Sequence, residues 1–577
     1  MRFLIFFTVV VLLIGCGYES KRIVPTYKTF AELEPLAGSP SLLKLFQKYK
    51  ELKPLTYRSV ASWPNGWTFQ LGAVDETLHA NVKPVEGQVV DLPHLVDKPD
   101  CSIWYRKEIH VPGDGLIRIQ TDDGAQLFIN GERVARIDGN YFPVRGGAQE
   151  LIIRVLNNAM SGGLRHVSFL STEEYQNYSS ELADFNILKH TVEKVLLFSN
   201  PNQDVVEQAL RAIEHPVGEH VQSLKAQTDE HPYITGPWIQ RNSEGAFILK
   251  AWLERSTTIQ LDYGFSPDRL DHFIEKTCDL CEFELTQIPT DGQVYYQLKV
   301  DKTISPQYHF STKETESFSF NVWADSQSGW ESFRQNMVNT QNFDDAFGIG
   351  VGDLVGNGSS ESEWRMFFNI LGTSAAQRPY YLVAGNHDYD GYYDDLVPQH
   401  YNRLVGGTSY QSWTYSNCAF ISLDPNERFP IGIPEGSQQY NWFMEQLQSD
   451  QWKSATWRFV FIHQPPYSQG WVGYEGDEVI RDLLEPLIES SKIDFVISGH
   501  THDYERLTKL YGKHQTTFLV VGGAGGPVEP PESSPVPKMD TVIKQHHMGR
   551  FYISESSLRF EALNTKNQKI DTFVLLK

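Results

Sequence analysis

Positive charge is in short supply in this sequence of 577 residues: 50 lysines and arginines face 72 aspartates and glutamates, which gives a formal net charge of −22. A nucleic-acid backbone is held by lysine and arginine, so no nucleic-acid partner is expected. Small phosphorylated substrates stay open, because bound metal ions reverse the local field. Internal repeats and long low-complexity tracts are also missing. With 40% hydrophobic and 13% aromatic residues, global disorder is excluded, and the length predicts about three or four domains.

Cysteine is scarce as well, with five residues in the whole chain. Cys278 and Cys281 form a C-x-x-C pair, a spacing found in redox sites and in halves of metal sites. A second half-site is missing, so a local disulfide or two plain thiols is the favoured interpretation. Cys101 and Cys418 have no evident partner in the sequence.

The apolar run near the N-terminus, Phe3–Ile14, is too short to span a bilayer comfortably and is typical of a signal-peptide core. It leads into Leu13-Ile14-Gly15-Cys16, which resembles a bacterial lipobox with cleavage before Cys16. We therefore expect a lipoprotein signal peptide over residues 1–15, a lipid on Cys16, and a tether with a short helix over residues 16–50. The chain would be exported and anchored to a membrane of the cell envelope, in the outer membrane or facing the periplasm if the cell is Gram-negative. The alternative is an ordinary secretory signal with a chance cysteine.

Residues 51–170 read as short strands and turns. Asn130-Gly131 predicts a tight hairpin turn after the strand-like run Leu127–Ile129. Together with the runs WYRKEI and RVLNNAMSGGLR, this stretch resembles the galactose-binding-like jelly-roll domains of many glycoside hydrolases. Asp122, Asp123 and Asn130 suit calcium or sugar contacts, but turn residues of a β-sandwich are the favoured interpretation. A glycan is expected as a partner of this domain only if these residues make sugar contacts.

Two further segments precede the C-terminal half. Residues 171–228 have a helical composition and are interpreted as a helical connector. Residues 229–312 alternate in the manner of strands, over Phe247–Leu253, Thr257–Tyr263 and Val294–Val300. That alternation suggests a fibronectin-III-like β-sandwich.

From residue 313 to 577 apolar, strand-like runs alternate with helical patterns, which predicts a layered α/β domain. Five of these runs end in polar side chains of the kinds that bind metals: Asp325, Asp353, Asn386 with His387, His463, and His500 with His502. Sheets of this kind build their sites at the carboxyl ends of the strands. Residues i and i+2 of an extended segment point the same way, so both imidazoles of the H-x-H pair can face one pocket.

Two aspartates, one asparagine and three histidines supply oxygen and nitrogen donors for two cations. A carboxylate can bridge such a pair, and the pair can clamp a phosphoryl group and lower the pKa of bound water. Each residue alone has a plainer explanation: a helix N-cap for Asp353, a turn for Asn386, a core histidine for His463, and a surface loop for the H-x-H pair. Chance placement of all of them at five strand ends is a poor explanation, so we predict a metal centre.

The motifs Asp325, GD, GNHD, VFIH and GHTH resemble those of the calcineurin-like metallophosphoesterases, and HDYER, HQPPYSQG and GGAGGP favour the purple acid phosphatase branch. The resemblance covers about residues 230–577 and implies an αββα-type domain. It implies that Asp325 and His502 hold one metal, that Asp353 bridges, and that Asn386, His463 and His500 hold the other. It also implies two divalent or trivalent ions (Fe, Zn or Mn), attack by a metal-bound hydroxide, and contact between His387 and the phosphate.

Two departures from that family matter. Purple enzymes carry a metal-binding tyrosine three residues after the bridging aspartate, where this chain has Gly356. Gln327 stands where other relatives place a histidine, and is either a ligand of the first metal or a loop residue. We therefore predict a colourless enzyme, with Tyr389 as the one replacement tyrosine considered.

Two functions from different classes are compatible with these patterns. The first is an exported, lipid-anchored hydrolase of phosphate esters with two metal ions. The alternative is a surface glycan-binding protein whose phosphatase domain is degenerate. The retained aspartates and histidines favour the enzyme.

Overall fold

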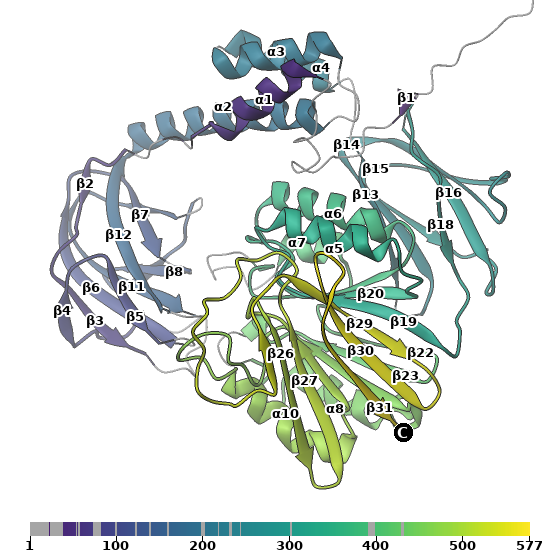
Figure 1. Ribbon diagram of the computed structural model, residues 1–577. Helices are drawn as coiled ribbons and strands as arrows, with labels where there is room; N and C mark the ends of the chain where they lie inside the picture. The colour runs from purple at the N-terminus through teal and green to yellow at the C-terminus, as the bar shows by residue number, and fades with distance from the viewer. Residues whose placement is uncertain are drawn as a thin grey trace, which may run out of the picture.

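The computed structural model of the chain is shown in Figure 1. It describes residues 22–23, 39–53, 55, 58–72, 82–98, 101–121, 124–137, 140–157, 161–197, 202–216, 218–229, 234–242, 244–300, 303–389, 398–428 and 432–577. The signal peptide, Cys16, Asp122 and Asp123 lie outside the described residues. No helix in these ranges is long and apolar enough to cross a membrane.

Two antiparallel sheets form the first body. One has the order β4 (Gln88–Val90), β3 (Trp67–Leu71), β6 (Cys101–Val111), β11 (Gly147–Asn157), β8 (Ala125–Ile129) and β9 (Glu132–Val134). The other has the order β10 (Tyr141–Val144), β7 (Gly115–Thr121), β12 (Ser161–Ser171) and β2 (Ala61–Ser62), with β5 (His94–Asp97) paired to β12.

Side chains of both sheets share one core, among them Ile103 and Leu151 of the first sheet and Ile117 and Leu164 of the second. A β-sandwich is therefore confirmed for this region, while its kinship with galactose-binding-like jelly rolls stays a prediction. Asn130 and Gly131 both have positive φ and join β8 to β9 as a two-residue hairpin, which confirms the predicted turn.

Four helices lie beside the sandwich: α1 (Pro40–Lys50), α2 (Thr172–Leu197), α3 (Gln203–Glu214) and α4 (Gly218–Asp229). Their apolar faces meet in one cluster that contains Leu45, Val192, Leu210 and Leu224. The helical connector predicted for residues 171–228 is thus present, and α1, expected as part of a tether, packs among its helices (Figure 1).

The next strands are β13 (Ile234–Arg241), β14 (Phe247–Gly264), β15 (His272–Leu285), β16 (Gln293–Val300), β17 (Thr303–Ile304) and β18 (Tyr308–Ser311), with β1 (Arg22–Ile23) paired to β17. Hydrogen bonds join them into one sheet, because β14 is long enough to pair with β13, β15 and β16. These strands enclose a single apolar core, and the fibronectin-III-like assignment stays a prediction. Cys278 and Cys281 form a disulfide within β15. Cys101 and Cys418 are buried and form no disulfide with any described residue.

The C-terminal domain is built on two sheets packed face to face. The first has the order β21 (Tyr380–Val383), β20 (Phe347–Val351), β19 (Phe318–Trp323), β29 (His547–Ile553), β30 (Ser557–Asn564) and β31 (Lys569–Leu576). The second has the order β22 (Gln411–Tyr415), β23 (Cys418–Leu423), β24 (Trp457–Ile462), β25 (Phe495–Ser498), β27 (His514–Val521), β26 (Tyr504–Tyr511) and β28 (Thr541–Ile543). Aromatic rings fill the space between them: Phe420 stacks on Phe459, and Phe320 meets both rings edge to face.

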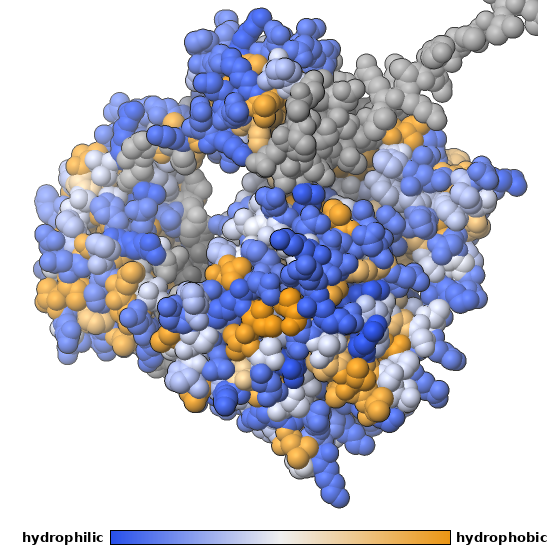
Figure 2. All heavy atoms as spheres, in the orientation of Figure 1, coloured by the Kyte–Doolittle hydropathy of each residue, from blue (hydrophilic) through white to orange (hydrophobic). Residues whose placement is uncertain are grey.

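Helices cover the outer faces of this pair of sheets. The first sheet is covered by α5 (Trp330–Thr340), α6 (Glu361–Ala375) and α7 (Gln399–Leu404). The second is covered by α8 (Gln438–Gln448), α9 (Asp450–Ser454) and α10 (Glu478–Ser491), and a short 3-10 helix spans Asn426–Arg428. The order of layers is helix, sheet, sheet, helix, as the resemblance implied. On the face shown in Figure 2, the surface is mostly hydrophilic and apolar residues gather in small separate patches.

Candidate metal centre

The predicted ligands follow the carboxyl ends of five strands of the C-terminal domain. Asp325 follows β19, Asp353 follows β20, Asn386 follows β21, His463 follows β24, and His500 with His502 follows β25. The parallel strands of both sheets end at this edge of the domain. The third of these strands ends at Val383, and a turn over residues 386–388 carries Asn386 and His387.

The structure brings these side chains together. His463 Nε2 lies 3.1 Å from Asp353 Oδ2 and 3.9 Å from Asp325 Oδ1. His502 Nε2 lies 3.6 Å from the same Asp325 oxygen. Asn386 Oδ1 lies 3.1 Å from His500 Nδ1. All six predicted metal residues therefore form one cluster, in which single ligand atoms of Asp353, His463 and His500 lie within 4.8 Å of one another.

The loops that carry the cluster hold unusual backbone conformations. Asp325, Asp353 and His500 have φ values of 60°, 50° and 72°, a left-handed region that non-glycine residues seldom adopt. Glycine lets two of the loops touch, since a Cβ on Gly385 would lie 2.2 Å from the backbone nitrogen of Asp353. Such strain persists where the surrounding structure fixes it, and it concentrates at functional sites.

Hydrogen bonds select which ring nitrogen of two histidines faces the cluster. His463 donates from Nδ1 to the Val351 carbonyl at 2.8 Å. His502 donates from Nδ1 to the Pro527 carbonyl at 2.9 Å. Each bond fixes the tautomer and leaves the Nε2 lone pair toward the aspartates, as in metal-binding histidines.

Burial sets the charge of the cluster. It lowers the pKa of His500 to about 3 and that of His502 to about 4, so both rings are neutral near pH 7, the form that binds metal. Burial, with Asp353 nearby, raises the pKa of Asp325 well above its usual value. Burial opposes ionisation of Asp353 too, but His463 and His387 outweigh it and lower its pKa. Burial thus favours the neutral form of Asp325, whereas the neighbouring histidines favour the ionised form of Asp353.

Two atoms in the cluster show that cations fit there. Asp325 Oδ1 and His463 Nε2 are buried, and neither makes a contact of hydrogen-bond geometry with a described residue, since the 3.1 Å contact of His463 Nε2 with Asp353 Oδ2 does not have that geometry. Buried polar atoms are normally paired, and an orphaned carboxylate oxygen beside an orphaned imidazole nitrogen is the pairing that a metal ion would satisfy. Asp353 Oδ2 lies against His463, and the Gln327 amide nitrogen lies near both Asp353 Oδ2 and His502 Nε2.

His387 occupies the rim of this cluster and is only partly buried. Its backbone nitrogen donates to Asp353 Oδ1 at 2.9 Å, and its Nδ1 donates to the Gly356 carbonyl at 2.9 Å. Any contact to a substrate must therefore be made through Nε2. The adjacent Asp388, which the sequence analysis did not single out, ties two ligand loops together by accepting from Leu354 and Gly385 nitrogens at 2.9 and 2.8 Å.

The structure gives clear positions to Gly356 and Gln327, the two residues that depart from the family motifs. Gly356 presents only backbone, and its nitrogen donates to Glu363 Oε2 at 2.6 Å. Gln327 is buried with its amide nitrogen 3.1 Å from His502 Nε2 and 3.3 Å from Asp353 Oδ2. The structure thus places the Gln327 amide nitrogen against His502 and Asp353, two predicted ligands, and a role of Gln327 as a ligand stays a prediction. Tyr389 is buried and donates to Asp424 Oδ2 at 2.7 Å, so its hydroxyl is engaged with a carboxylate.

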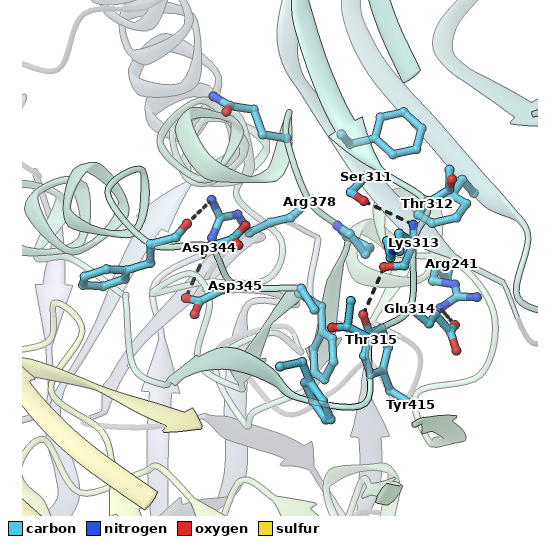
Figure 3. A pocket seen from close by; sticks show the side chains of 18 of the residues that line it. Arg241, Ser311, Thr312, Lys313, Glu314, Thr315, Asp344, Asp345, Arg378 and Tyr415 are labelled. Carbon is cyan, nitrogen blue, oxygen red and sulfur yellow. Dashed lines mark hydrogen bonds and ion pairs between the residues drawn. The ribbon is translucent and has the colours of Figure 1, made fainter. Parts of the chain in front are cut away.

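A separate cavity of about 580 Å³ lies away from this cluster (Figure 3). It is lined by Phe318, Phe347 and Tyr381, which belong to the opposite, N-terminal ends of the strands. Its cationic side chains already face carboxylates: Arg241 and Glu314 lie 2.8 Å apart, Lys313 and Asp291 3.3 Å, and Arg378 and Asp345 3.8 Å. The cavity therefore has no surplus charge that indicates a ligand.

Comparison with known proteins agrees with this geometry. Residues 322–504, which contain all six predicted metal residues, match the calcineurin-like phosphoesterase family. The chain is 27% identical to purple acid phosphatase 21 of Arabidopsis thaliana over 211 residues, 34% of this chain and 48% of that protein. It is 26% identical to Fe(3+)-Zn(2+) purple acid phosphatase 12 of the same plant over 188 residues, 30% of this chain and 38% of that protein.

The chain thus spans less than half the length of these two relatives. A solved structure of a purple acid phosphatase from seeds of yellow lupin (Lupinus luteus) has the same fold, with a TM-score of 0.52 and 13% identity over 88% of this chain and 96% of that one. The described chain therefore carries a calcineurin-like metallophosphoesterase domain that has purple acid phosphatases among its homologues.

Proposed function

We propose that the chain hydrolyses phosphate esters with the help of two metal ions held at the strand ends of the C-terminal domain. The single observation that carries the proposal is the convergence of six donors around Asp353, where Asp325 Oδ1 and His463 Nε2 are buried without a hydrogen-bond partner among the described residues. A degenerate site would have lost some of these donors. The complete set supports the enzyme over the glycan-binding alternative.

The side chains divide the work as follows. Asp325 and His502 would hold one ion, Asn386, His463 and His500 the other, and Asp353 would touch both. The ions, when bound, would clamp the phosphoryl group and lower the pKa of water. His387, fixed through Nδ1 to Gly356, would place Nε2 against the phosphoryl oxygens and hold a proton for the departing alkoxide.

Fe, Zn and Mn all suit this mixture of carboxylate, amide and imidazole donors. One homologue is named an Fe(3+)-Zn(2+) enzyme. This chain has Gly356 where a phenolate would bind ferric iron, so we propose that divalent ions suffice.

Export and anchoring complete the proposal, and they are supported by the sequence alone. Phe3–Ile14 with Cys16 would direct the chain to the cell envelope and attach a lipid to it. A glycan would be a partner of the N-terminal β-sandwich only if its resemblance to galactose-binding-like domains extends to their binding.

The experiment that tests the proposal compares turnover of p-nitrophenyl phosphate and of bis(p-nitrophenyl) phosphate by the purified chain. We expect hydrolysis of at least one ester, loss of hydrolysis after chelation, and recovery on adding Mn, Zn or Fe(II). Failure of all three metals to restore turnover of either ester would refute it. The ratio of the two rates then separates a monoesterase from a diesterase.

A further inference from the structure

Asp424 is a buried carboxylate that neither the sequence motifs nor the predicted roles include. It follows β23 directly and is 0% exposed. β23 pairs with β24, and β24 ends next to His463. The side chain therefore lies beside the strand ends that carry the second group of ligands.

Two sets of contacts run from Asp424 to the loop that carries Asn386. Tyr389, three residues beyond Asn386, donates its hydroxyl to Asp424 Oδ2 at 2.7 Å. Asn426 donates from its backbone and side-chain nitrogens to Asp424 Oδ1, both at 2.9 Å. The same Asn426 amide group donates to the carbonyl of Ala384, two residues before Asn386, at 3.3 Å.

A third contact runs to the loop that carries His463. Gln464, the next residue, donates from Nε2 to Asn426 Oδ1 at 2.6 Å. Asp424 is itself held in place by Gln439, whose amide donates to the Asp424 carbonyl at 2.7 Å and accepts from its nitrogen at 2.8 Å. The network thus touches the Asn386 loop on both sides and the His463 loop on one.

Stability alone is a weak explanation for this arrangement. The donors to the carboxylate are Ser409, Tyr389 and Asn426, all neutral, and a buried carboxylate among neutral donors costs free energy. An apolar side chain would fill the same space without that cost. What the carboxylate adds is two oxygens in fixed directions, one toward Tyr389 and one toward Asn426.

We propose that Asp424 is a positioning residue that, through Tyr389, Asn426 and Gln464, fixes the spacing between Asn386 and His463 and so shapes the second metal position. The inference rests on the proposed function in naming that position, and it assigns Tyr389 to the network. Groups behind metal ligands commonly change metal affinity or activity by about 10-fold to 100-fold when they are removed.

Tyr389→Phe is the test variant, and Tyr401→Phe is its matched control. Both tyrosines are buried in the same apolar cluster, but the Tyr401 hydroxyl donates to the Leu382 carbonyl within β21 at 2.6 Å and not to Asp424. Each variant loses one buried hydroxyl bond and keeps its ring, so the losses in Tm should be similar. Asp424→Asn keeps one acceptor oxygen and should give an intermediate effect.

Two measurements separate positioning from plain stability. The first titrates Co²⁺ into each protein and follows affinity and the visible Co²⁺ spectrum. We expect the weaker of the two sites to lose about 10-fold or more in affinity in Tyr389→Phe, with a changed spectrum, and Tyr401→Phe to stay within about twofold of wild type. The second measures amide hydrogen exchange in the metal-free proteins, where residues 384–389 and the amides of His463 and Gln464 should exchange faster in Tyr389→Phe only.

The outcomes distinguish this inference from the proposed function. If Tyr389→Phe matches Tyr401→Phe in both measurements, the positioning role is wrong, whatever the enzyme hydrolyses. If the wild type binds no Co²⁺, the proposed function fails, while the exchange rates still decide whether the network holds the two loops.

Discussion

At the scale of single residues, the chemistry depends on which oxygen or nitrogen each side chain presents. Asp353 Oδ2 lies 3.1 Å from His463 Nε2, and Asp353 Oδ1 accepts the backbone nitrogen of His387 at 2.9 Å. The two oxygens of this carboxylate therefore face a predicted ligand, His463, and the backbone of the residue assigned to substrate, His387. Removing its charge should affect both of them.

Asp353→Asn should lower turnover by more than about 100-fold and reduce the bound metal to one ion or fewer. Replacing a residue that only hydrogen-bonds to a metal ligand already lowers metal affinity or activity by about 10-fold to 100-fold, and Asp353 is itself a predicted ligand. Metal content by mass spectrometry and turnover of p-nitrophenyl phosphate check this. Asp262→Asn is the matched control, since Asp262 is a buried aspartate that pairs with Lys299 in the separate β14–β16 sheet. Full metal content in Asp353→Asn would contradict the bridging role.

His387→Ala should behave differently. It should lower kcat by about 10²-fold to 10⁴-fold, the usual contribution of a positioned acid or base, yet keep both metal ions. The reason is that the structure places His387 at the rim, with Nδ1 bound to Gly356. A metal-free His387→Ala protein would show that the ring is a ligand instead.

The absorption spectrum is also decided by single residues. Gly356 has no phenol, and burial together with Asp424 raises the pKa of Tyr389 well above its usual value, so Tyr389 stays a phenol bonded to Asp424. The purified enzyme loaded with iron should therefore lack a strong tyrosinate–iron band in its visible spectrum. A purple protein would mean that another tyrosine enters the site.

At the scale of elements, the sequence motifs correctly predicted every strand that carries a predicted ligand. Each of these strands is an apolar run that is followed closely by a polar, metal-binding type of residue. They gave no sign of β22 and β23, which insert between the third and fourth of those strands. The run Cys418–Leu423 is six residues long and wholly buried, and periodicity cannot tell such a short run from a buried piece of helix. Asp424 was missed with it, because its role depends on contacts with residues 389 and 426.

His547, at the start of β29, leads to a prediction about how the stability of the folded chain depends on pH. His547 is fully buried, its Nε2 has no hydrogen-bond partner among the described residues, and burial lowers its pKa to about 4 from 6.5. Above pH 6.5 the ring is neutral both folded and unfolded. As the pH falls toward 4 the unfolded chain takes up the proton first, so this histidine removes stability.

Wild type should therefore lose Tm relative to His547→Gln as the pH falls from 7 to 5, by about 2–4 °C per pH unit. Thermal unfolding of the metal-free proteins at three pH values measures the gap. A gap that does not change with pH would mean that His547 is protonated without cost in the folded chain.

At the scale of the whole molecule, the sandwich, the helices, the β13–β18 sheet and the C-terminal domain follow the predicted order (Figure 1). Sequence composition could not show that α1 packs among the later helices, because that contact joins residues more than 120 positions apart in the chain. Nor could it show how the β13–β18 sheet docks on the C-terminal domain. There Arg365 of α6 lies 3.7 Å above the ring of Trp252, and the Tyr296 hydroxyl donates to the Ala376 carbonyl at 2.7 Å.

Anchoring is a property of the whole molecule that residue 16 should control. Cys16→Ser removes the proposed lipid attachment point and leaves the apolar run Phe3–Ile14 intact, so export should persist while the protein leaves the membrane fraction. Fractionation of cells that express each form measures this. A wild-type protein found free of membranes would rule out the anchor.

The most direct test of two metal ions sharing Asp353 is anomalous X-ray diffraction from crystals of the chain loaded with zinc or manganese. The account predicts two anomalous peaks about 3.5–4 Å apart, one beside Asp325 and His502, the other beside Asn386, His463 and His500, with the Asp353 carboxylate between them. A single peak, or none within this ring of side chains, would contradict it.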